Sequence, residues 1–174
     1  MFFTRRRAIL IGVVAALAAG IIFTPLILTL TLPPDINVVK INLENVEVAK
    51  PSPEEETSNI LTLNVFFKVD NPTDKTLTTS KIDYTLSANG ESLGSGHVDY
   101  VDIPVHGRPQ LLSGGQATIS SKFEIPRNDP SLAQLNVGNL SSSDINWEAE
   151  GTADIESGFV TTPLAFKDEF RRSL

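Results

Sequence analysis

An alternation of apolar and polar residues with period two most restricts what this chain can fold into. In residues 61–69, LTLNVFFKV, every second side chain is apolar, which is typical of a β-strand with one buried face. Asn71-Pro72 ends this pattern, because proline cannot donate to a strand ladder and asparagine bonds its own backbone in turns. The alternation returns over residues 82–86, and Asn89-Gly90 supplies the positive φ angles of a two-residue hairpin turn. We therefore expect antiparallel strands joined by tight turns.

The same period recurs on both sides of this stretch. Residues 39–43 alternate, and the parity shifts at residues 46–48, which indicates a bulge near Glu44-Asn45. Further strands are predicted over residues 97–105, 117–125, 145–155 and 159–166. Residues 117–125 have the clearest pattern of this group. Trp147 lies on the apolar face of its strand, so we expect it in the core rather than in a ligand site.

One short helix is predicted after residue 128. Asp129 can cap it and Pro130 suits its first position. Leu132 and Leu135 would face the core, and Gly138 can end the helix. About seven or eight strands with regularly spaced turns and one helix indicate a mainly β fold, an antiparallel β-sandwich.

The N-terminal residues have a different character. Residues 8–32 contain no charge over 25 positions, and Arg5, Arg6 and Arg7 precede them. A transmembrane helix needs about 20 apolar residues, and basic residues mark its cytoplasmic side. We expect a single-pass anchor in the cell membrane, with the N-terminus cytoplasmic and the remaining chain extracytoplasmic. The alternative is a signal peptide cleaved near residues 16–18, which would leave an apolar N-terminus on the exported domain.

These features divide the chain into five predicted parts. They are a basic N-terminus at residues 1–7, a transmembrane helix at 8–32, a short linker at 33–37, the sandwich at 38–167 and a polar tail at 168–174. The linker begins with Pro33-Pro34, which ends the helix and stiffens the spacer. We therefore expect the sandwich to lie near the membrane surface.

Charge and cysteine content exclude several classes of function. Setting aside the three arginines leaves 11 basic residues against 21 acidic ones, a net charge of −10 on the external part. Such a surface repels nucleic acid, so no nucleic-acid partner is expected. The absence of cysteine removes disulfides, thiolate catalysis and cysteine-based metal sites.

No group of residues forms a recognisable catalytic motif. His97 and Asp99 share one face of an extended strand, with Asp102 and His106 close behind, but their spacing matches no closed zinc site. The chain has neither a G-x-S-x-G elbow nor a P-loop. We predict no catalytic residue, no metal and no cofactor, and hence no enzyme. Phe66 lies on the opposite face from Phe67, so it is the candidate for an apolar ligand or interaction face.

Three segments together resemble a known family. VFFKVDNPTDKTL, IDYTLSANGESLGSG and VDIPVHG are similar to the group 2 late embryogenesis abundant (LEA) family, also called the WHy (water stress and hypersensitive response) domain. The resemblance extends over residues 38–166. It implies an immunoglobulin-like or fibronectin type III-like sandwich with one helix, a role in tolerance of desiccation and other stress, and no defined catalytic residues.

Three hypotheses for function follow. The first is a non-enzymatic, membrane-anchored domain that protects or organises the envelope under desiccation or temperature stress. The second is a module near the membrane that binds a lipid or another apolar ligand. The third is a structural surface subunit that associates with a protein partner through a strand edge.

Overall fold

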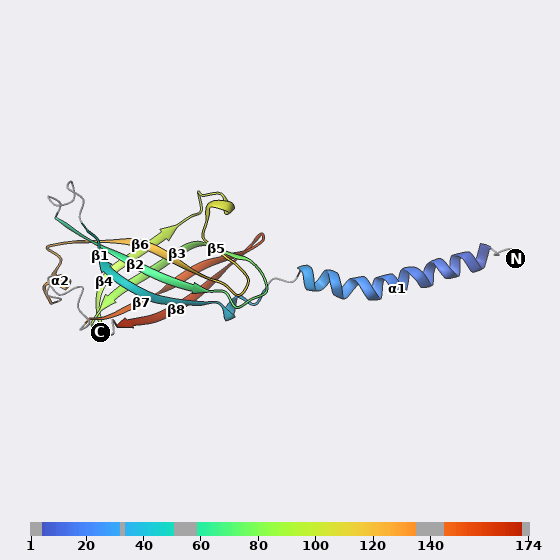
Figure 1. Ribbon diagram of the computed structural model, residues 1–174, viewed down its shortest axis with the longest axis horizontal. Coiled ribbons are helices and arrows are strands. Elements are labelled where there is room, and N and C mark those ends of the chain that lie inside the picture. The colour runs from blue at the N-terminus through green and yellow to red at the C-terminus, as the bar shows by residue number, and fades with distance from the viewer. Residues whose placement is uncertain (1–4, 32–33, 51–58, 135–144, 172–174) are drawn as a thin grey trace. The chain divides into compact units, whose positions relative to one another are not determined.

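The computed structural model describes residues 5–31, 34–50, 59–134 and 145–171. The chain divides into two compact units, Met1–Pro33 and Pro34–Leu174, which Figure 1 shows as a helix and a set of strands. Each unit is described by itself below. Two predicted features of the short helix, the core position of Leu135 and the helix end at Gly138, lie outside the described residues.

The first unit is the helix α1 (Arg5–Thr31), in agreement with the helix predicted for this segment. Large apolar side chains are exposed on every side of it, including Ile9, Val13, Leu17, Ile21 and Phe23. Within the described part of the chain, no helix is both long enough and apolar enough to cross a membrane. Membrane insertion of residues 8–32 stays a prediction.

The described residues of the second unit form eight strands and three short helical segments. In chain order they are η1 (Ile36–Val38), β1 (Lys40–Val48), β2 (Ile60–Asp70), β3 (Leu77–Ala88), β4 (Glu91–Asp99), η3 (Val105–Gly107), β5 (Gln110–Leu111), β6 (Gln116–Pro126), α2 (Pro130–Gln134), β7 (Asn146–Ser157) and β8 (Val160–Arg171).

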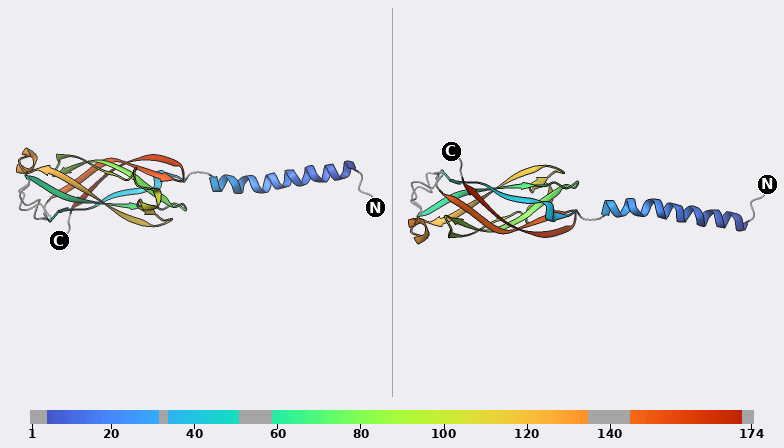
Figure 2. Two further views of the ribbon diagram at one scale, coloured as in Figure 1. Left: turned by 90° about the horizontal axis from the view of Figure 1, so that it is seen from above. Right: turned by 90° about the horizontal axis from the view of Figure 1, so that it is seen from below.

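Two antiparallel sheets make up this unit (Figures 1 and 2). Sheet A has the order β1-β2-β6, and sheet B has the order β4-β3-β7-β8, with β5 added beside the start of β3. β1 runs close to β8, and β4 runs close to β6, so the edges of the two sheets face each other. The prediction of a mainly β, antiparallel fold with one short α-helix in the domain is confirmed.

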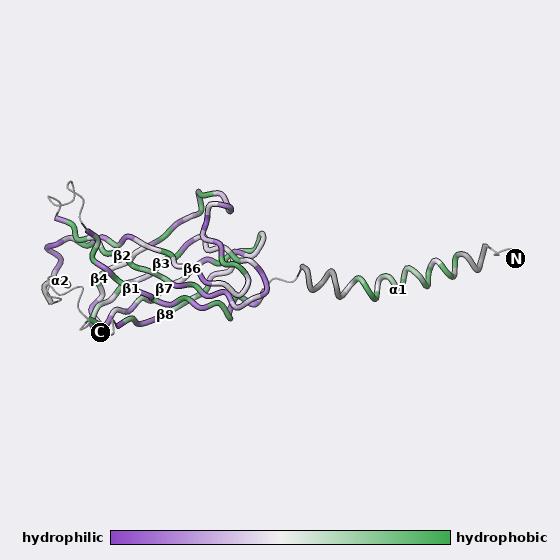
Figure 3. The backbone as a smooth tube through the Cα atoms, viewed as in Figure 1, coloured by the Kyte–Doolittle hydropathy of each residue, from purple (hydrophilic) through white to green (hydrophobic). Residues whose placement is uncertain are grey.

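Alternate residues of each strand form the core between the sheets, and Figure 3 shows the resulting alternation of hydropathy along the backbone. Phe67 is fully buried at its centre. Its ring meets Tyr84 edge-on with the centroids 4.8 Å apart, and meets Phe166 in the same way at 5.6 Å. Burial of one such aromatic ring contributes about 1.5–3 kcal/mol. Trp147 is buried as predicted.

A bulge interrupts β1 where the sequence predicts one. The register with β2 shifts between Leu43 and Asn45, so Glu44 is the extra residue. The backbone N–H of Leu43 donates to the carboxylate Oδ2 of Asp168 on β8, at 2.7 Å. A side chain of sheet B therefore satisfies a donor of sheet A at this edge.

Two predicted strands have the wrong bounds. The strand predicted over residues 97–105 is β4, which begins at Glu91 and ends at Asp99. The Asp99 carboxylate accepts the N–H of Val101 at 2.7 Å, an Asx turn that stops the strand. At the C-terminus, β8 continues to Arg171 and includes part of the predicted polar tail. In this added part Glu169 and Arg171 are exposed, Asp168 accepts from Leu43, and Phe170 lies opposite Trp147.

Local turn predictions agree better with the structure. Asn89 and Gly90 have φ angles of 52° and 86°, as a two-residue hairpin requires. Asp129 accepts hydrogen bonds from the backbone N–H of Ser131 at 2.9 Å and from its hydroxyl at 2.6 Å. Leu132 is buried, and the described part of α2 begins at Pro130 as predicted.

Candidate functional site

The end of the second unit at which β1 begins is called the proximal end, and it comprises residues 36–40, 70–77, 100–115 and 156–160. The strand registers place these segments together: Lys40 is opposite Asp70, Leu77 opposite Leu111, and Ser157 opposite Val160. The opposite end is called the distal end and comprises residues 88–91, 126–132 and 145–146. It brings the Asn89-Gly90 hairpin, the start of α2 and the start of β7 together.

Asn71 holds the loops of the proximal end together. This residue is almost fully buried, and its side-chain amide donates to three backbone carbonyl oxygens at 2.8 to 3.0 Å, those of Lys75, Leu111 and Leu112. Its Oδ1 accepts from the N–H and the hydroxyl of Thr73. The Asx turn at Asn71-Pro72 is therefore confirmed. The Asn71 side chain also links two segments that are 40 residues apart in the sequence.

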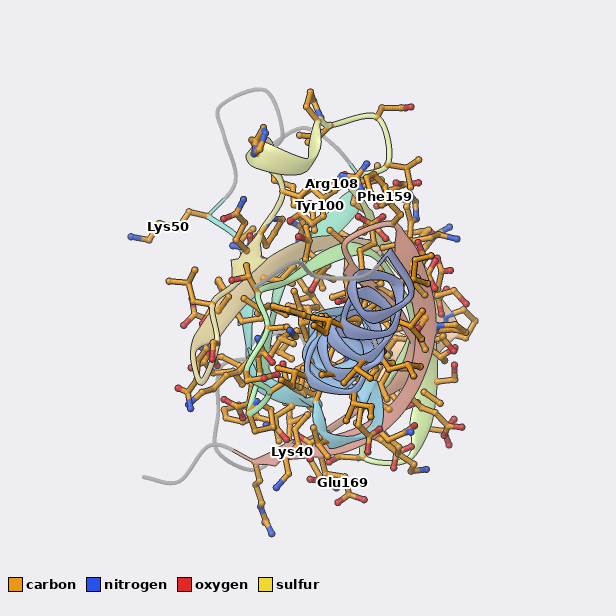
Figure 4. The ribbon with its side chains drawn as sticks, turned by 90° about the vertical axis from the view of Figure 1, so that its right-hand side faces the viewer. Lys40, Lys50, Tyr100, Arg108, Phe159 and Glu169 are labelled. Carbon is orange, nitrogen blue, oxygen red and sulfur yellow. The ribbon has the colours of Figure 1, made fainter. Side chains whose placement is uncertain are left out.

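Arg108 fixes a second loop of this end. Its Nη1 lies 2.7 Å from both carboxylate oxygens of Glu156 on β7, and only 11% of the arginine side chain is exposed. Its Nε and Nη2 donate to the carbonyl oxygens of Ile103 and Val101, at 2.7 and 2.8 Å. Because Glu156 precedes the turn between β7 and β8, the Arg108–Glu156 pair holds the loop 101–107 beside that turn. Figure 4 labels Arg108 and Phe159 in the same part of its end-on view.

The outer face of sheet B is polar and acidic. Two adjoining shallow hollows lie on it, of about 450 and 530 Å³, and they share Thr85, Glu150 and Thr152. Asp83 and His97 extend the first hollow, whereas Glu148 belongs to the second. The lining contains hydroxyls and carboxylates, which bind water and cations rather than apolar ligands.

Lysines neutralise only part of this acidic face. Lys81 lies 2.6 Å from Asp83, and the hydrogen bond and charge of Asp83 raise the pKa of Lys81. Lys167 on β8 lies 3.0 Å from Glu148 and 3.2 Å from Glu150, which raise the pKa of Lys167 in the same way. These pairs are exposed, so they hold the carboxylates in place with little effect on stability.

Two glycines that line the first hollow have no room for a side chain. A Cβ at Gly96 would clash with the Tyr84 ring, and one at Gly151 would clash with the backbone of Asp83. The Tyr84 hydroxyl donates to Ser121 at 2.8 Å, which bridges the two sheets inside the core. Burial raises the pKa of Tyr84, and the hydrogen bond with Ser121 opposes this shift.

The histidines and aspartates singled out from the sequence are not brought together. His97 is exposed on β4, and Asp99 is engaged in the turn to Val101. His106 and Asp102 lie exposed in and near η3. In the described ranges, no group of three histidine, cysteine or carboxylate side chains could hold a metal ion.

Phe66 is half-buried on the outer face of sheet A. It lies opposite Asn45 on β1 and Ser120 on β6, so its immediate neighbours on this face are polar. The structure places it in the middle of a strand, away from both ends of the unit. Its role as an interaction face stays a prediction.

Sequence reasoning missed the Arg108–Glu156 pair. The partners are 48 positions apart, and a single arginine between Gly107 and Pro109 carries no sign of a specific partner. The long-range bonds of Asn71 were also missed, although the Asn-Pro pattern marked the residue. Only the folded arrangement of the proximal end reveals these contacts.

No family model matches the chain, and no curated protein matches its sequence. Solved structures similar to it include a protein from Archaeoglobus fulgidus, with 16% identity, 76% of this chain and 99% of that chain covered, and a TM-score of 0.40. Another is a protein from Arabidopsis thaliana, with 17% identity, coverage of 76% and 80%, and a TM-score of 0.48. A third is described as a candidate late embryogenesis abundant protein, with 15% identity, coverage of 92% and 84%, and a TM-score of 0.38.

Proposed function

We propose that this chain is a non-enzymatic, membrane-anchored domain of the LEA group 2 type that protects envelope components when water is withdrawn. The observation that carries the proposal is the polar, acidic outer face of sheet B. Carboxylates project from it on β3 and β7, and Lys167 bridges two of them without neutralising both. A surface of this kind binds water strongly and keeps the domain soluble and separate from anionic neighbours.

The anchor part of the proposal rests on residues 8–32. They are uncharged and follow three arginines, and the apolar side chains of α1 are exposed all round the helix. A helix that is apolar on every side is favoured in lipid or in the core of a larger protein. The proposal places the N-terminus in the cytoplasm and residues 34–174 outside, by the charge rule.

A drying experiment tests the protective role. Residues 34–174 form a compact unit with its own core, and circular dichroism would establish that the fragment is folded. A labile enzyme is dried and rehydrated with the fragment, with an unrelated acidic β-sandwich of equal charge, or with no addition. We expect the fragment to preserve more activity than the unrelated protein. Equal preservation by the two proteins would refute a specific role.

A matched variant tests the observation that carries the proposal. E148Q/E150Q removes two carboxylates from the outer face of sheet B, and both side chains contact Lys167 rather than the core. We expect this variant to fold normally and to protect less well. The control S92Q/S95Q changes exposed positions on β4 without removing a charge. If both variants protect equally, the acidic face is not the source of protection.

A further inference from the structure

Exposed large apolar side chains gather at the proximal end of the second unit. Seven such residues are exposed among its described positions, and six of them belong to this end: Val38, Val101, Ile103, Leu112, Phe159 and Val160. The seventh, Ile60, is opposite Pro126 near the distal end. Scattered exposed apolar residues are ordinary, but concentration at one end indicates a surface with a partner.

The most exposed of these side chains is at the tip of a hairpin. Phe159 follows Gly158, whose φ of 62° forms the turn between β7 and β8, and the phenylalanine is fully exposed. Val160 beside it is 51% exposed. An aromatic ring at the tip of a two-stranded projection makes no contribution to the core of its own domain. Its position at the tip allows it to insert into an apolar environment outside the domain.

The loop that carries Val101 and Ile103 is held in place beside this tip. Arg108 donates to the carbonyl oxygens of both residues and pairs with Glu156, three positions before Phe159. The loop backbone is thereby held to the strand that leads into the hairpin. A rigid arrangement loses little conformational entropy when its apolar side chains are buried against a partner.

We infer that the proximal end docks on the lipid bilayer, with Phe159, Val160, Val101 and Ile103 in the interfacial layer. The inference rests on the proposed membrane anchor. Only residues 33–35 lie between the apolar segment and Ile36, where the proximal end begins. Extended chain spans about 3.5 Å per residue, so this linker keeps the proximal end within about 15 Å of the apolar segment. Insertion from a tethered domain is intramolecular and needs little intrinsic affinity.

The net charge of the domain determines which lipid headgroups it can approach. The external part carries a net charge of −10, and Asp102 lies exposed between Val101 and Ile103. Anionic headgroups would repel this surface, whereas zwitterionic headgroups would accept its apolar side chains. The expected partner is therefore a bilayer rich in zwitterionic lipid such as phosphatidylcholine.

Depth measurements on the full chain in phosphatidylcholine vesicles test the inference. The chain contains no cysteine, so V160C and S92C each introduce a single site for a nitroxide spin label, near the proximal and distal ends. Collisions of the label with oxygen report lipid, and collisions with a water-soluble nickel chelate report solvent. We expect the ratio of oxygen to nickel collisions to be about threefold higher at 160 than at 92, as for an apolar face buried in the interface.

Two further variants separate docking from other causes. V101D/F159D in the V160C background should lower the ratio to the value at position 92, whereas the matched change I60D near the distal end should leave it unchanged. Circular dichroism and thermal unfolding would verify that both variants stay folded. Equal ratios at 160 and 92 in chain that remains bound after an alkaline wash would overturn the docking and leave the anchor intact.

Two other outcomes also count against the inference. If the wash releases the chain from the vesicles, the anchor fails and the docking fails with it. If the label at 160 is shielded from nickel but shows spin–spin broadening, a second copy of the chain covers the surface instead of lipid. That result would overturn the assignment to a bilayer.

Discussion

The proximal and distal ends of the second unit close the same two sheets by different means. At the distal end, turns use neighbouring residues: Asn89-Gly90 forms the hairpin, and Asp129 caps α2 by bonding Ser131 two positions on. At the proximal end, loops are fixed by side chains that reach 40 positions or more along the chain, from Asn71 and Arg108. The Asn89 Oδ1 at the distal end also accepts one long-range bond, from the N–H of Asn146. The side chains of the proximal end make several such bonds, so the proximal end depends more on the fold that surrounds it.

The largest difference in stability between the two ends is expected when Asn71 and Asn89 are substituted. N71A removes three donated hydrogen bonds, one of them buried, and the two bonds that the Asn71 Oδ1 accepts from Thr73. We expect it to lower the free energy of unfolding by about 3 kcal/mol, since each hydrogen bond lost costs about 0.5–1.5 kcal/mol. Chemical denaturation followed by Trp147 fluorescence measures the change.

N89G is the matched control at the distal end. Glycine accepts the positive φ of this position, so the change removes one hydrogen bond, from Asn146 N–H to the Asn89 Oδ1 at 2.9 Å. We expect a loss of about 1 kcal/mol or less. A loss equal to that of N71A would show that the two ends are secured alike.

The next largest loss of stability is expected when Arg108 is substituted. R108M removes the partly buried contact with both carboxylate oxygens of Glu156 and two exposed hydrogen bonds to loop carbonyls. We expect a loss of about 2 kcal/mol, the range for hydrogen bonds of charged groups. Hydrogen exchange should accelerate in residues 100–108 and not in residues 88–91.

The interaction energy between Arg108 and Glu156 can be measured by a double-mutant cycle. E156Q retains the shape of the side chain and removes its charge, and R108M/E156Q completes the cycle. A coupling energy of about 1 kcal/mol or more would support a direct interaction. Strict additivity of the two single changes would contradict it.

Tyr84 lies between the two ends and serves as a reference that should affect both equally. Y84F removes the hydrogen bond to Ser121, and we expect a loss of about 1 kcal/mol. The pKa of Tyr84 is raised above its ordinary value of 10.0, so its contribution to stability is complete below that pH. This contribution is lost as the pH rises through the higher pKa of the folded state, because the unfolded state ionises first.

Unfolding of the native protein and of Y84F across alkaline pH measures this linkage. The native protein should lose stability more steeply than Y84F above pH 10.0. Parallel curves would show that Tyr84 is not protected from ionisation by burial. Acceleration of hydrogen exchange at only one end would contradict its role as a common reference.

The smallest expected effect concerns the cap of α2. The side-chain and backbone hydrogen bonds from Ser131 lower the pKa of Asp129 below 3.8. The stabilisation is therefore present above that pH and is lost as the pH falls through the lower pKa of the folded state. S131A should raise the pKa of Asp129 toward its ordinary value, as measured by carboxyl carbon NMR. An unchanged pKa would show that Ser131 is not its partner.

The sequence could predict whatever depends on adjacent residues. Strand alternation, the bulge at Glu44, the hairpin at Asn89-Gly90 and the start of α2 all follow from local sterics and hydrogen bonding. The strand predicted through residue 105 was wrong because Asp99 forms a turn that competes with an apolar pattern. The apolar alternation alone therefore does not predict where the strand ends.

The two candidate surfaces are the acidic outer face of sheet B and the apolar proximal end. Each is formed by residues that are distant in the sequence, so no local pattern predicts it. The acidic face requires the pairing of β3, β7 and β8, and Lys167 on β8 pairs with Glu148 and Glu150 on β7. The apolar residues of the proximal end come from loops that look unrelated in the sequence. Val101 and Ile103 lie within the strand predicted over residues 97–105, whereas the structure exposes both in the loop after β4.

The direction of β1 has a mechanical consequence. β1 starts at the proximal end, whereas β8 finishes at the distal end, where Arg171 is opposite Asn146. A pull between the two termini of this unit acts along β1, across hydrogen bonds that run perpendicular to the strand. These bonds are loaded together in shear rather than broken one after another, and the contact of Asp168 with Leu43 ties the strand to the second sheet as well. A domain tethered through β1 is therefore arranged to withstand tension.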